Sequence, residues 1–531
     1  MTAAAAAGES TQGDRAAEWR MALAIVVAGA LVRLVFAAVL PVFPDEAYYW
    51  TWSRHLAAGY FDHPPMIAWL IRLGGLFAPA VNGATPLAVR FGPVVAGLVA
   101  GLCTLSLARR LAPAGEAAAL RASLIITTIP LAAAGLVLAT PDAPLLATTA
   151  LTLYFIVRAL LAARDAAGAR LAWWTLAGIA LGLAFSSKYT SILIPVGVAA
   201  AVTAHPRLRW QLRTAGPYLA CAAATLVFLP VLVWNAHHAW ISFAFQVHHG
   251  LAAPDNHAIR KALQREGDFL GGQAGLASPI LFVMLVIAAA RALRIRRQDS
   301  ERDAVRFVLA VVTVLSFGLF VYSALRQRVE PNWPSASYIP AIALLASAVA
   351  TARWERWLRA GIALAVVLSL LVYVQGVSPV LPVAPARDPV ARAFGWDALA
   401  RATDSAAITL SDSTRARTWL GADRYQEASE IAFHAPAHPL TFAVNVASRP
   451  NQYDLWSGFA TTAARGENLV LALDDRAEPD PVIARLAPFF ASVKRGEVVP
   501  LRRGLGVVGT RRLWELVGFR GGWPARGQNG R

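Results

Sequence analysis

Residues 44–65, PDEAYYWTWSRHLAAGYFDHPP, decide how the rest of the chain is interpreted. They lie between two apolar segments and are too polar to cross a membrane themselves. A connecting loop needs no acidic or aromatic cluster. Chemistry at a membrane surface would use a carboxylate to take a proton, aromatic rings at the headgroup level and prolines to fix the backbone. The residues of interest in this stretch are Asp45, Glu46, Tyr49, Asp62 and His63.

The composition places the chain among membrane proteins. Of its 531 residues, 57% are hydrophobic and only 15% are charged, whereas a soluble chain carries about a quarter charged residues. The net charge of +17 comes mostly from arginine. The positive-inside rule explains this excess through cytoplasmic loops, so no nucleic-acid partner is expected. The two cysteines lie in apolar runs and do not support a disulfide framework.

The apolar runs predict a polytopic helical protein with about eleven spans, each near the ~20 residues that a bilayer requires. Arginine clusters in alternate loops all fall on one side if the N-terminus is cytoplasmic, which puts residues 44–65 outside. The expected spans are 20–41, 87–108, 120–139, 142–162, 171–187, 189–204, 215–234, 277–293, 305–325, 337–352 and 360–378.

The character of the chain changes after about residue 380. TWLGADRYQEASEIAFHAP is typical of a helix, while PLTFAVNV and NLVLALDD are typical of short strands, which predicts a small external α/β domain. MIAWLIRLGGLFAP is amphipathic and is expected to lie in the membrane interface. The predicted organisation is a cytoplasmic polar head over 1–19, a transmembrane domain over 20–380 with an external first loop over 42–86, an external soluble domain over 381–515 and a disordered tail over 516–531.

Three carboxylates are candidates for catalysis. Asp45 and Glu46 either complement a helix dipole as solvated acids or act as a general base and its partner, since close like charges raise one pKa. Asp142, in ATPDAPLLA, either caps the fourth span or adds a third carboxylate to the same external face.

Basic and aromatic groups are candidates for substrate binding. Lys188 lies at the outer end of the fifth span, where it either snorkels to the interface or contacts a phosphate. Arg326 and Arg328, in the external RQRVEPNWP, have forked guanidiniums that suit phosphate oxygens, and Trp333 beside them suits a sugar face or the interface. Tyr49 belongs to an aromatic run that either forms an interfacial belt or stacks on a sugar.

No cofactor is predicted. The histidines at 237, 238, 248 and 249 have the wrong spacing for a helical metal pair, so the spacing does not support a divalent metal, and the requirement for one stays open. No nucleotide-binding motif or nucleophile elbow is present. An external active site has no cytosolic nucleotide-sugar within reach, so an activated donor would have to arrive in the membrane.

Several blocks of sequence resemble the bacterial branch of glycosyltransferase family 39, which is related to protein O-mannosyltransferases and to lipid A aminoarabinose transferases. The resemblance covers residues 20–380 approximately, and RPNQYDLW in the external domain also looks familial. The blocks are PDEAYYWTWSRHLAAGYFDHPPMIAWLIRLGG, RFGPVVAGL, TPDAPLLA, GLAFSSKYTSIL and EPNWPSASYIP.

The resemblance implies a GT-C bundle in the inner membrane. It implies inverting transfer of a sugar, on the periplasmic side, from a polyprenyl-phosphate donor to a lipid A, glycan or protein acceptor. Asp45 would be the base or the acceptor-orienting group, and Asp142 matches the aspartate of the fourth span. Asp62 and His63 occupy an acid–base position, where histidine makes the charge pH-dependent. The donor phosphate would be held by Lys188, Arg326 and Arg328, and the further substrate-binding residues would be Tyr49, Asn332 and Trp333.

Two other function classes compete with the transferase. A transporter or lipid-linked-sugar flippase would place ionisable groups near the bilayer midplane and show repeated halves, whereas this chain keeps its acids near the outer ends of spans and shows no repeat. A non-catalytic assembly partner would not need Asp45 and Asp142. The sequence therefore favours the transferase.

Overall fold

The computed structural model describes residues 2–77, 84–113, 116–250, 259–294, 300–349, 351–446, 449–475 and 480–524. The chain divides into two units, and the division does not follow the chain order. The first unit comprises Met1–Ala37, His63–Leu70 and Arg90–Val374. The second comprises Ala38–Asp62, Ile71–Val89 and Gln375–Arg531, so residues 44–62 belong with the C-terminal segment.

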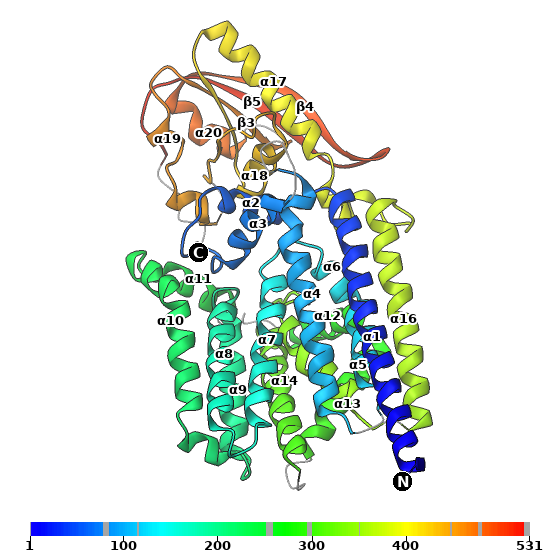
Figure 1. Ribbon diagram of the computed structural model, residues 1–531. Helices are drawn as coiled ribbons and strands as arrows, with labels where there is room; N and C mark the ends of the chain where they lie inside the picture. The colour runs from blue at the N-terminus through cyan, green and yellow to red at the C-terminus, as the bar shows by residue number, and fades with distance from the viewer. Residues whose placement is uncertain are drawn as a thin grey trace. The chain divides into compact units, whose positions relative to one another are not determined.

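The first unit is a helical bundle whose longer helices stand side by side (Figure 1). Seven helices in the described part of the chain are long and apolar enough to cross a membrane, and a pair bent by 100° would make an eighth. This arrangement confirms the polytopic helical class. The seven are α1 (Thr2–Val39), α4 (Pro86–Leu111), α7 (Asp142–Leu160), α8 (Ala167–Phe185), α10 (Gly216–His237), α14 (Glu301–Arg326) and α16 (Ala352–Val377); the bent pair is α12 (Ile259–Ala277) and α13 (Pro279–Arg294).

Three expected spans are built from shorter helices. In the first of them, residue Ile129 is extended with ψ 140°, and Pro130 begins a new helix because its ring cannot continue the preceding one. The number of eleven spans therefore stays a prediction. The shorter elements are α5 (Ala118–Thr128), α6 (Pro130–Gly135), η2 (Tyr189–Ile192), α9 (Leu193–Ala204), η5 (Ser335–Ser337) and α15 (Tyr338–Ala346); η3 (Arg209–Arg213) and α11 (Ile241–Gly250) connect others.

Helices α8 and α10 pack closely because glycines remove side chains from their contact. Gly178 and Gly182 are spaced four residues apart on one face of α8. A Cβ atom at Gly178 would lie 2.2 Å from the carbonyl oxygen of Ala220 in α10, and one at Gly182 would lie 2.8 Å from that of Ala224. Small residues at this spacing allow backbones to approach in membrane helices, where lipid provides no hydrophobic drive for association.

The Gly178→Ala variant should therefore lower the thermal unfolding temperature of the purified protein. Its added methyl meets backbone and forces α8 and α10 apart, at a cost of about 1–3 kcal/mol. Gly318→Ala in α14 is the control, because no atom lies within 4 Å of its added Cβ and alanine is the better helix former. Equal unfolding temperatures for wild type and Gly178→Ala would contradict this account of the packing.

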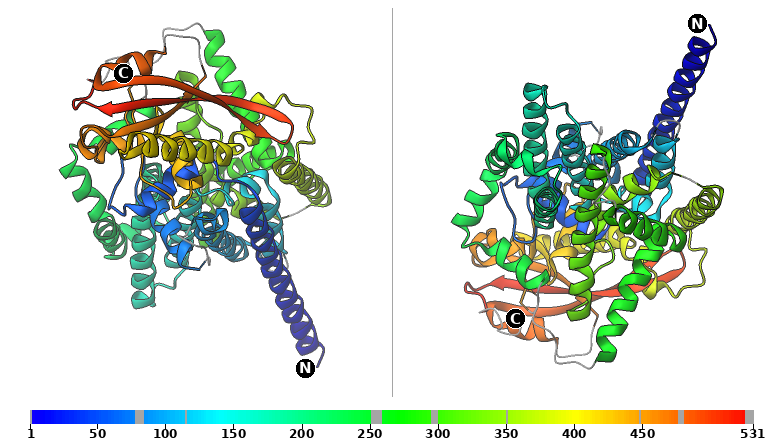
Figure 2. Two further views of the ribbon diagram at one scale, coloured as in Figure 1. Left: turned by 90° about the horizontal axis from the view of Figure 1, so that it is seen from above. Right: turned by 90° about the horizontal axis from the view of Figure 1, so that it is seen from below.

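The second unit is built on a five-stranded mixed sheet of order β2-β1-β3-β5-β4. Strand β1 pairs in parallel with β2 and β3, and β5 pairs antiparallel with β3 and β4. Helix α17 lies along the sheet, as Figure 2 shows. This confirms the predicted α/β domain. The strands are β1 (Thr418–Ala422), β2 (Thr441–Ala443), β3 (Asn468–Asp474), β4 (Phe490–Arg503) and β5 (Gly506–Phe519); the helices are α2 (Pro44–Arg54), α17 (Trp396–Thr414), α18 (Tyr425–His434), α19 (Phe459–Thr462) and α20 (Pro481–Leu486), with short turns η6 (Pro385–Arg387), η7 (Pro389–Ala393), η8 (Gln452–Leu455) and η9 (Ala487–Phe489).

Two local predictions in this unit need correction. The segment from Thr418 was expected to be helical throughout, but its first five residues form β1, because pairing on both sides buries them; α18 begins only at Tyr425. The tail was expected to be disordered from residue 516, but β5 continues to Phe519, which pairs with Phe490. Residues 525–531 lie outside the described residues. The amphipathic stretch forms helix α3 (Met66–Phe77), and its position in the membrane interface stays a prediction.

Candidate functional site

The first cluster of predicted residues surrounds Asp142 in the first turn of α7, where the helix dipole favours a carboxylate. Its Oδ1 accepts hydrogen bonds from Lys188 Nζ at 2.8 Å and from Ser335 Oγ at 3.2 Å. Its Oδ2 accepts one from Asn332 Nδ2 at 2.6 Å. The Asp142 and Lys188 side chains are only 8% and 10% exposed. Three segments far apart in sequence therefore converge on one buried carboxylate.

This arrangement gives Asp142 and Lys188 different chemical capacities. Both oxygens of Asp142 already accept hydrogen bonds, so the carboxylate is suited to holding its neighbours in place. Lys188 lies where α8 ends and η2 begins, and its ammonium carries three N–H groups. With one of these directed to Asp142, the ammonium keeps donors that suit a phosphate oxygen. The sequence predicted Asp142, Lys188 and Asn332 separately, and the structure joins them.

The structure does not join the two predicted arginines to this cluster. Arg326, in the last turn of α14, donates to the hydroxyl of Tyr322 at 2.7 Å. The Arg328 side chain is 84% exposed and pairs with Glu330 at 3.2 Å. Both arginines thus have local partners, and their role in binding phosphate stays a prediction.

Two further predicted residues have neighbours in the first unit. His63 Nδ1 lies 3.3 Å from Nε2 of Gln246. Trp333 packs edge-on against Phe320, with 6.3 Å between ring centroids. These contacts hold the two side chains within the first unit, and the substrate-binding roles of His63 and Trp333 stay predictions.

The second cluster is built on α2. Pro44 starts this helix with its φ already fixed for it. Glu46, which is 1% exposed, turns back and accepts a hydrogen bond from the Phe43 N–H at 3.0 Å. This capping bond satisfies an otherwise unpaired N–H and gives Glu46 a structural role, so its catalytic role stays a prediction. Tyr49 is 8% exposed and packs on Trp52, with ring centroids 4.9 Å apart.

Asp62 is the centre of a network that the sequence did not reveal. Its buried carboxylate accepts a hydrogen bond from the Tyr48 hydroxyl at 2.7 Å and pairs with Arg449 at 2.7 Å. The Tyr48 oxygen accepts in turn from the Gln452 N–H at 2.7 Å, and the Gln452 side chain accepts from the Phe61 N–H at 2.8 Å. Burial and the Asp62 charge both raise the pKa of Tyr48, which keeps its hydroxyl protonated as a donor. The segment RPNQY, residues 449–453, is thus fastened to the first loop.

Asp45 lies beside this network at the first turn of α2. Solvent reaches its side chain, while the surrounding protein displaces much of the water around the carboxyl. This burial raises the pKa of Asp45 above its ordinary value; Asp62 raises it further, and a hydrogen bond from Gln426 and the charge of Arg392 oppose the rise. A carboxylate with a raised pKa is a stronger base, and it is accessible here.

Sequence reasoning missed three residues of the network around Asp62. Arg449 and Gln452 lie in RPNQYDLW, whose familial look was the only signal. Tyr425, whose hydroxyl accepts from Arg449 at 2.8 Å, carried none. Among the residues that the structure describes, no group of three or more His, Cys, Asp or Glu side chains is placed to hold a metal ion.

Similarity to a known enzyme decides the family. The chain is 30% identical over 359 residues to the lipid A galacturonosyltransferase RgtD of Rhizobium johnstonii, an alignment that covers 66% of this chain and 70% of that protein. The chain belongs to the GT-C superfamily of glycosyltransferases. Residues 62–234 of this GT-C enzyme also match the family described as dolichyl-phosphate-mannose-protein mannosyltransferase.

Solved structures share its fold. ArnT from Cupriavidus metallidurans, bound to undecaprenyl phosphate, superposes with a TM-score of 0.61 at 15% identity, covering 94% of this chain and 98% of that one. The archaeal oligosaccharyltransferase AglB from Archaeoglobus fulgidus gives 0.52 at 12% identity, covering 85% and 69%. The predicted GT-C architecture with a small C-terminal sheet domain is confirmed.

The Asp62 network predicts that Arg449 stabilises the second unit. Arg449→Met leaves a carboxylate that is only 5% exposed without its cation. We expect a loss of about 2 kcal/mol, below the usual cost for a fully buried pair because Arg449 is itself 41% exposed. Thermal unfolding of the purified protein measures the loss.

Two further variants make this test specific. Asp62→Asn combined with Arg449→Met should cost less than the sum of the single changes, because the double variant leaves no unpaired charge. Arg424→Met is the control, since Arg424 is 52% exposed and 3.6 Å from Asp474, a surface pair worth at most about 1 kcal/mol. Additive losses would show that Arg449 acts independently of Asp62.

Proposed function

We propose that this GT-C enzyme moves a sugar, with inversion, from a polyprenyl-phosphate-linked donor to a lipid A-type acceptor at the periplasmic face of the inner membrane. The relative RgtD is named for action on lipid A, and the fold-related ArnT binds undecaprenyl phosphate. The arginine distribution along the chain supports the periplasmic placement. Asp45 carries the proposal most directly, because it is an accessible carboxylate with a raised pKa beside the Asp62 network.

The reaction proceeds by one displacement. Asp45 accepts the proton of an acceptor hydroxyl as its oxygen attacks the anomeric carbon of the donor sugar. The bond between that carbon and the phosphate oxygen breaks, and polyprenyl phosphate leaves with the electron pair. Lys188, held by Asp142, donates to the phosphate oxygens. Such fixed charges stabilise a leaving anion without reorganisation in the transition state.

Replacement of Asp45 tests its role as the base. Asp45→Asn should lower the transfer rate at least about 100-fold, which is the usual contribution of a general base. The measurement is release of polyprenyl phosphate in reconstituted vesicles supplied with undecaprenyl-phosphate sugar and lipid A. Because burial disfavours the ionised form of Asp45, the variant should unfold at a temperature no lower than that of wild type. Asp412→Asn, on an exposed part of α17, is the control.

The pH profile makes the assignment sharper. The base must be ionised, so the wild-type rate should fall as the pH drops through the pKa of Asp45, which lies above the ordinary value of about 4. Asp45→Asn should lose this acidic limb and keep a low, flat rate. An acidic limb that persists in the variant would assign the titration to another group and refute the role.

Replacement of Lys188 tests the donor phosphate contact. Lys188→Met should raise KM for the donor about tenfold or more while KM for the acceptor changes little, because a charge-assisted contact to phosphate is lost. Asp142→Asn with Lys188→Met keeps the buried site neutral and protects the fold. The exposed Lys261→Met is the control. If the donor and acceptor KM values rise equally in the folded double variant, Lys188 does not recognise the donor.

A further inference from the structure

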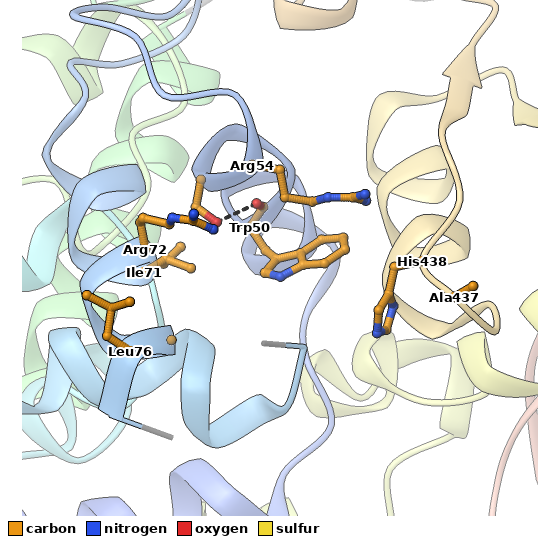
Figure 3. Close-up of a pocket in the computed structure, with 9 residues that line it drawn as sticks. Trp50, Arg54, Ile71, Arg72, Leu76, Ala437 and His438 are labelled. Atoms are coloured by element: carbon orange, nitrogen blue, oxygen red, sulfur yellow. Dashed lines mark hydrogen bonds between the residues drawn. The ribbon is translucent and has the colours of Figure 1, made fainter. Parts of the chain in front are cut away.

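A pocket in the second unit lies at the other end of α2 from Asp45. It has a volume of about 600 Å³ and is walled by the last turns of α2, by α3 and by the turn after α18 (Figure 3). Arg72 of α3 lies on one side of Trp50, and the Arg54 guanidinium of α2 and His438 lie on the other. The guanidinium of Arg54 lies 4.9 Å from the Trp50 ring centroid, which holds it in place as a cation–π contact.

The pocket gathers positive charge without an acid to balance it. In the described part of the chain, no aspartate or glutamate lines the pocket, and neither Arg54 nor Arg72 forms an ion pair. Residues 78–83, APAVNG, which follow α3, contain no acid either. Elsewhere in this unit arginines pair with carboxylates, as Arg449 does with Asp62. Two guanidiniums in one pocket therefore present donors that suit an anion from outside the chain.

His438 adds an independent sign of a ligand. Its Nδ1 is buried and has no hydrogen-bond partner among the described residues. A buried polar atom in that state costs free energy unless a ligand or water satisfies it. Ala437 and His438 both have positive φ, +59° and +48°, a conformation that non-glycine residues rarely adopt. This strained turn holds the imidazole beside Trp50, with ring centroids 5.6 Å apart.

The surface beside the pocket is apolar. Leu73, Leu76 and Phe77 on α3 are 50%, 73% and 64% exposed, and Leu76 also lines the pocket. An anion-binding pocket next to exposed hydrophobic side chains suits a ligand that carries a phosphate on an acylated headgroup. Because α3 is expected to lie in the membrane interface, the pocket would open beside lipid, where a membrane-anchored ligand reaches it more readily than free phosphate or a soluble glycan.

The position along α2 separates this pocket from the reacting atoms. Asp45 and Arg54 are nine residues apart in one helix, which corresponds to about 13 Å along its axis. An acceptor oxygen at Asp45 and an anionic group at Arg54 thus belong to different sugar units of one glycolipid. We propose that Arg54, Arg72 and His438 bind a phosphate of a phosphorylated glycolipid acceptor, distant from its reacting hydroxyl. This inference rests on the proposed function.

Acceptor selectivity is the test. The acceptors are lipid A and the same lipid A after removal of its phosphates. Wild type should show a KM at least about tenfold lower for the phosphorylated form. Arg54→Gln with Arg72→Gln should abolish this preference while kcat at saturating acceptor stays within about twofold. Lys494→Gln with Arg502→Gln, which removes two exposed charges from β4, should behave as wild type. A double variant that keeps the preference would overturn the proposal.

A binding measurement separates this inference from the proposed transfer. Titration calorimetry in detergent, without donor, measures lipid A and phosphatidylglycerol against each variant. Phosphate-dependent lipid A binding that requires Arg54 and Arg72 supports the pocket even if no transfer occurs, in which case the proposed function fails alone. Equal weakening of phosphatidylglycerol binding would make the pocket a general headgroup contact and overturn the inference. Arg72→Gln alone leaves the contact between Arg54 and Trp50 intact, and it should give an intermediate loss if the double variant unfolds.

Discussion

The buried carboxylate of Asp62 is the constraint on which the arrangement of the second unit depends. A charge in that position must be compensated, and the compensation comes from Tyr48 at 2.7 Å and from Arg449 at 2.7 Å, whose positions differ by 401 in the sequence. Gln452 closes the network by bonding both Tyr48 and the backbone at Phe61. As a result, α2 folds with the C-terminal sheet domain. The network therefore holds the helix that carries Asp45 in its first turn and Arg54 in its last.

The parts of this protein that the sequence predicted are those with local causes. Apolar runs predict membrane helices and alternating short runs predict strands, so the bundle and the α/β domain were both recognisable. The cluster of Asp142, Lys188 and Asn332 was predicted residue by residue from short motifs. The contact of Arg449 with Asp62 was not predicted, because nothing in the sequence around Arg449 indicates a partner so far along the chain. The break at Pro130 shows why spans are hard to count from sequence. The apolar run continues through residues 120–139, but the helical hydrogen bonding stops between α5 and α6.

Asp45 and Asp142 looked alike in the sequence, and their surroundings give them different chemistry. Asp142 receives three donors, from Lys188, Asn332 and Ser335, which makes it an anchor for an ammonium. Asp45 is accessible to solvent, and burial with the nearby charge of Asp62 raises its pKa. Asp142 is thus suited to holding its neighbours, whereas the raised pKa of Asp45 suits the role of base that we propose for it. This difference comes from hydrogen-bond donors and desolvation, which a sequence motif does not contain.

The excess of arginine has more than one physical origin. In the bundle, Arg109 and Arg158 lie over tryptophan rings in the last turns of their helices, ends that the positive-inside rule predicts to be cytoplasmic. In the second unit, Arg511 instead completes a buried pair with Glu427. Arg54 and Arg72 fit neither pattern, because they meet around one pocket without an acid. Under the proposed function, both substrates come from the membrane, where apolar contact and a phosphate are features that many lipids share. A pair of guanidiniums held nine residues along α2 from Asp45 would instead select a lipid whose phosphate lies at the matching distance from its reacting hydroxyl.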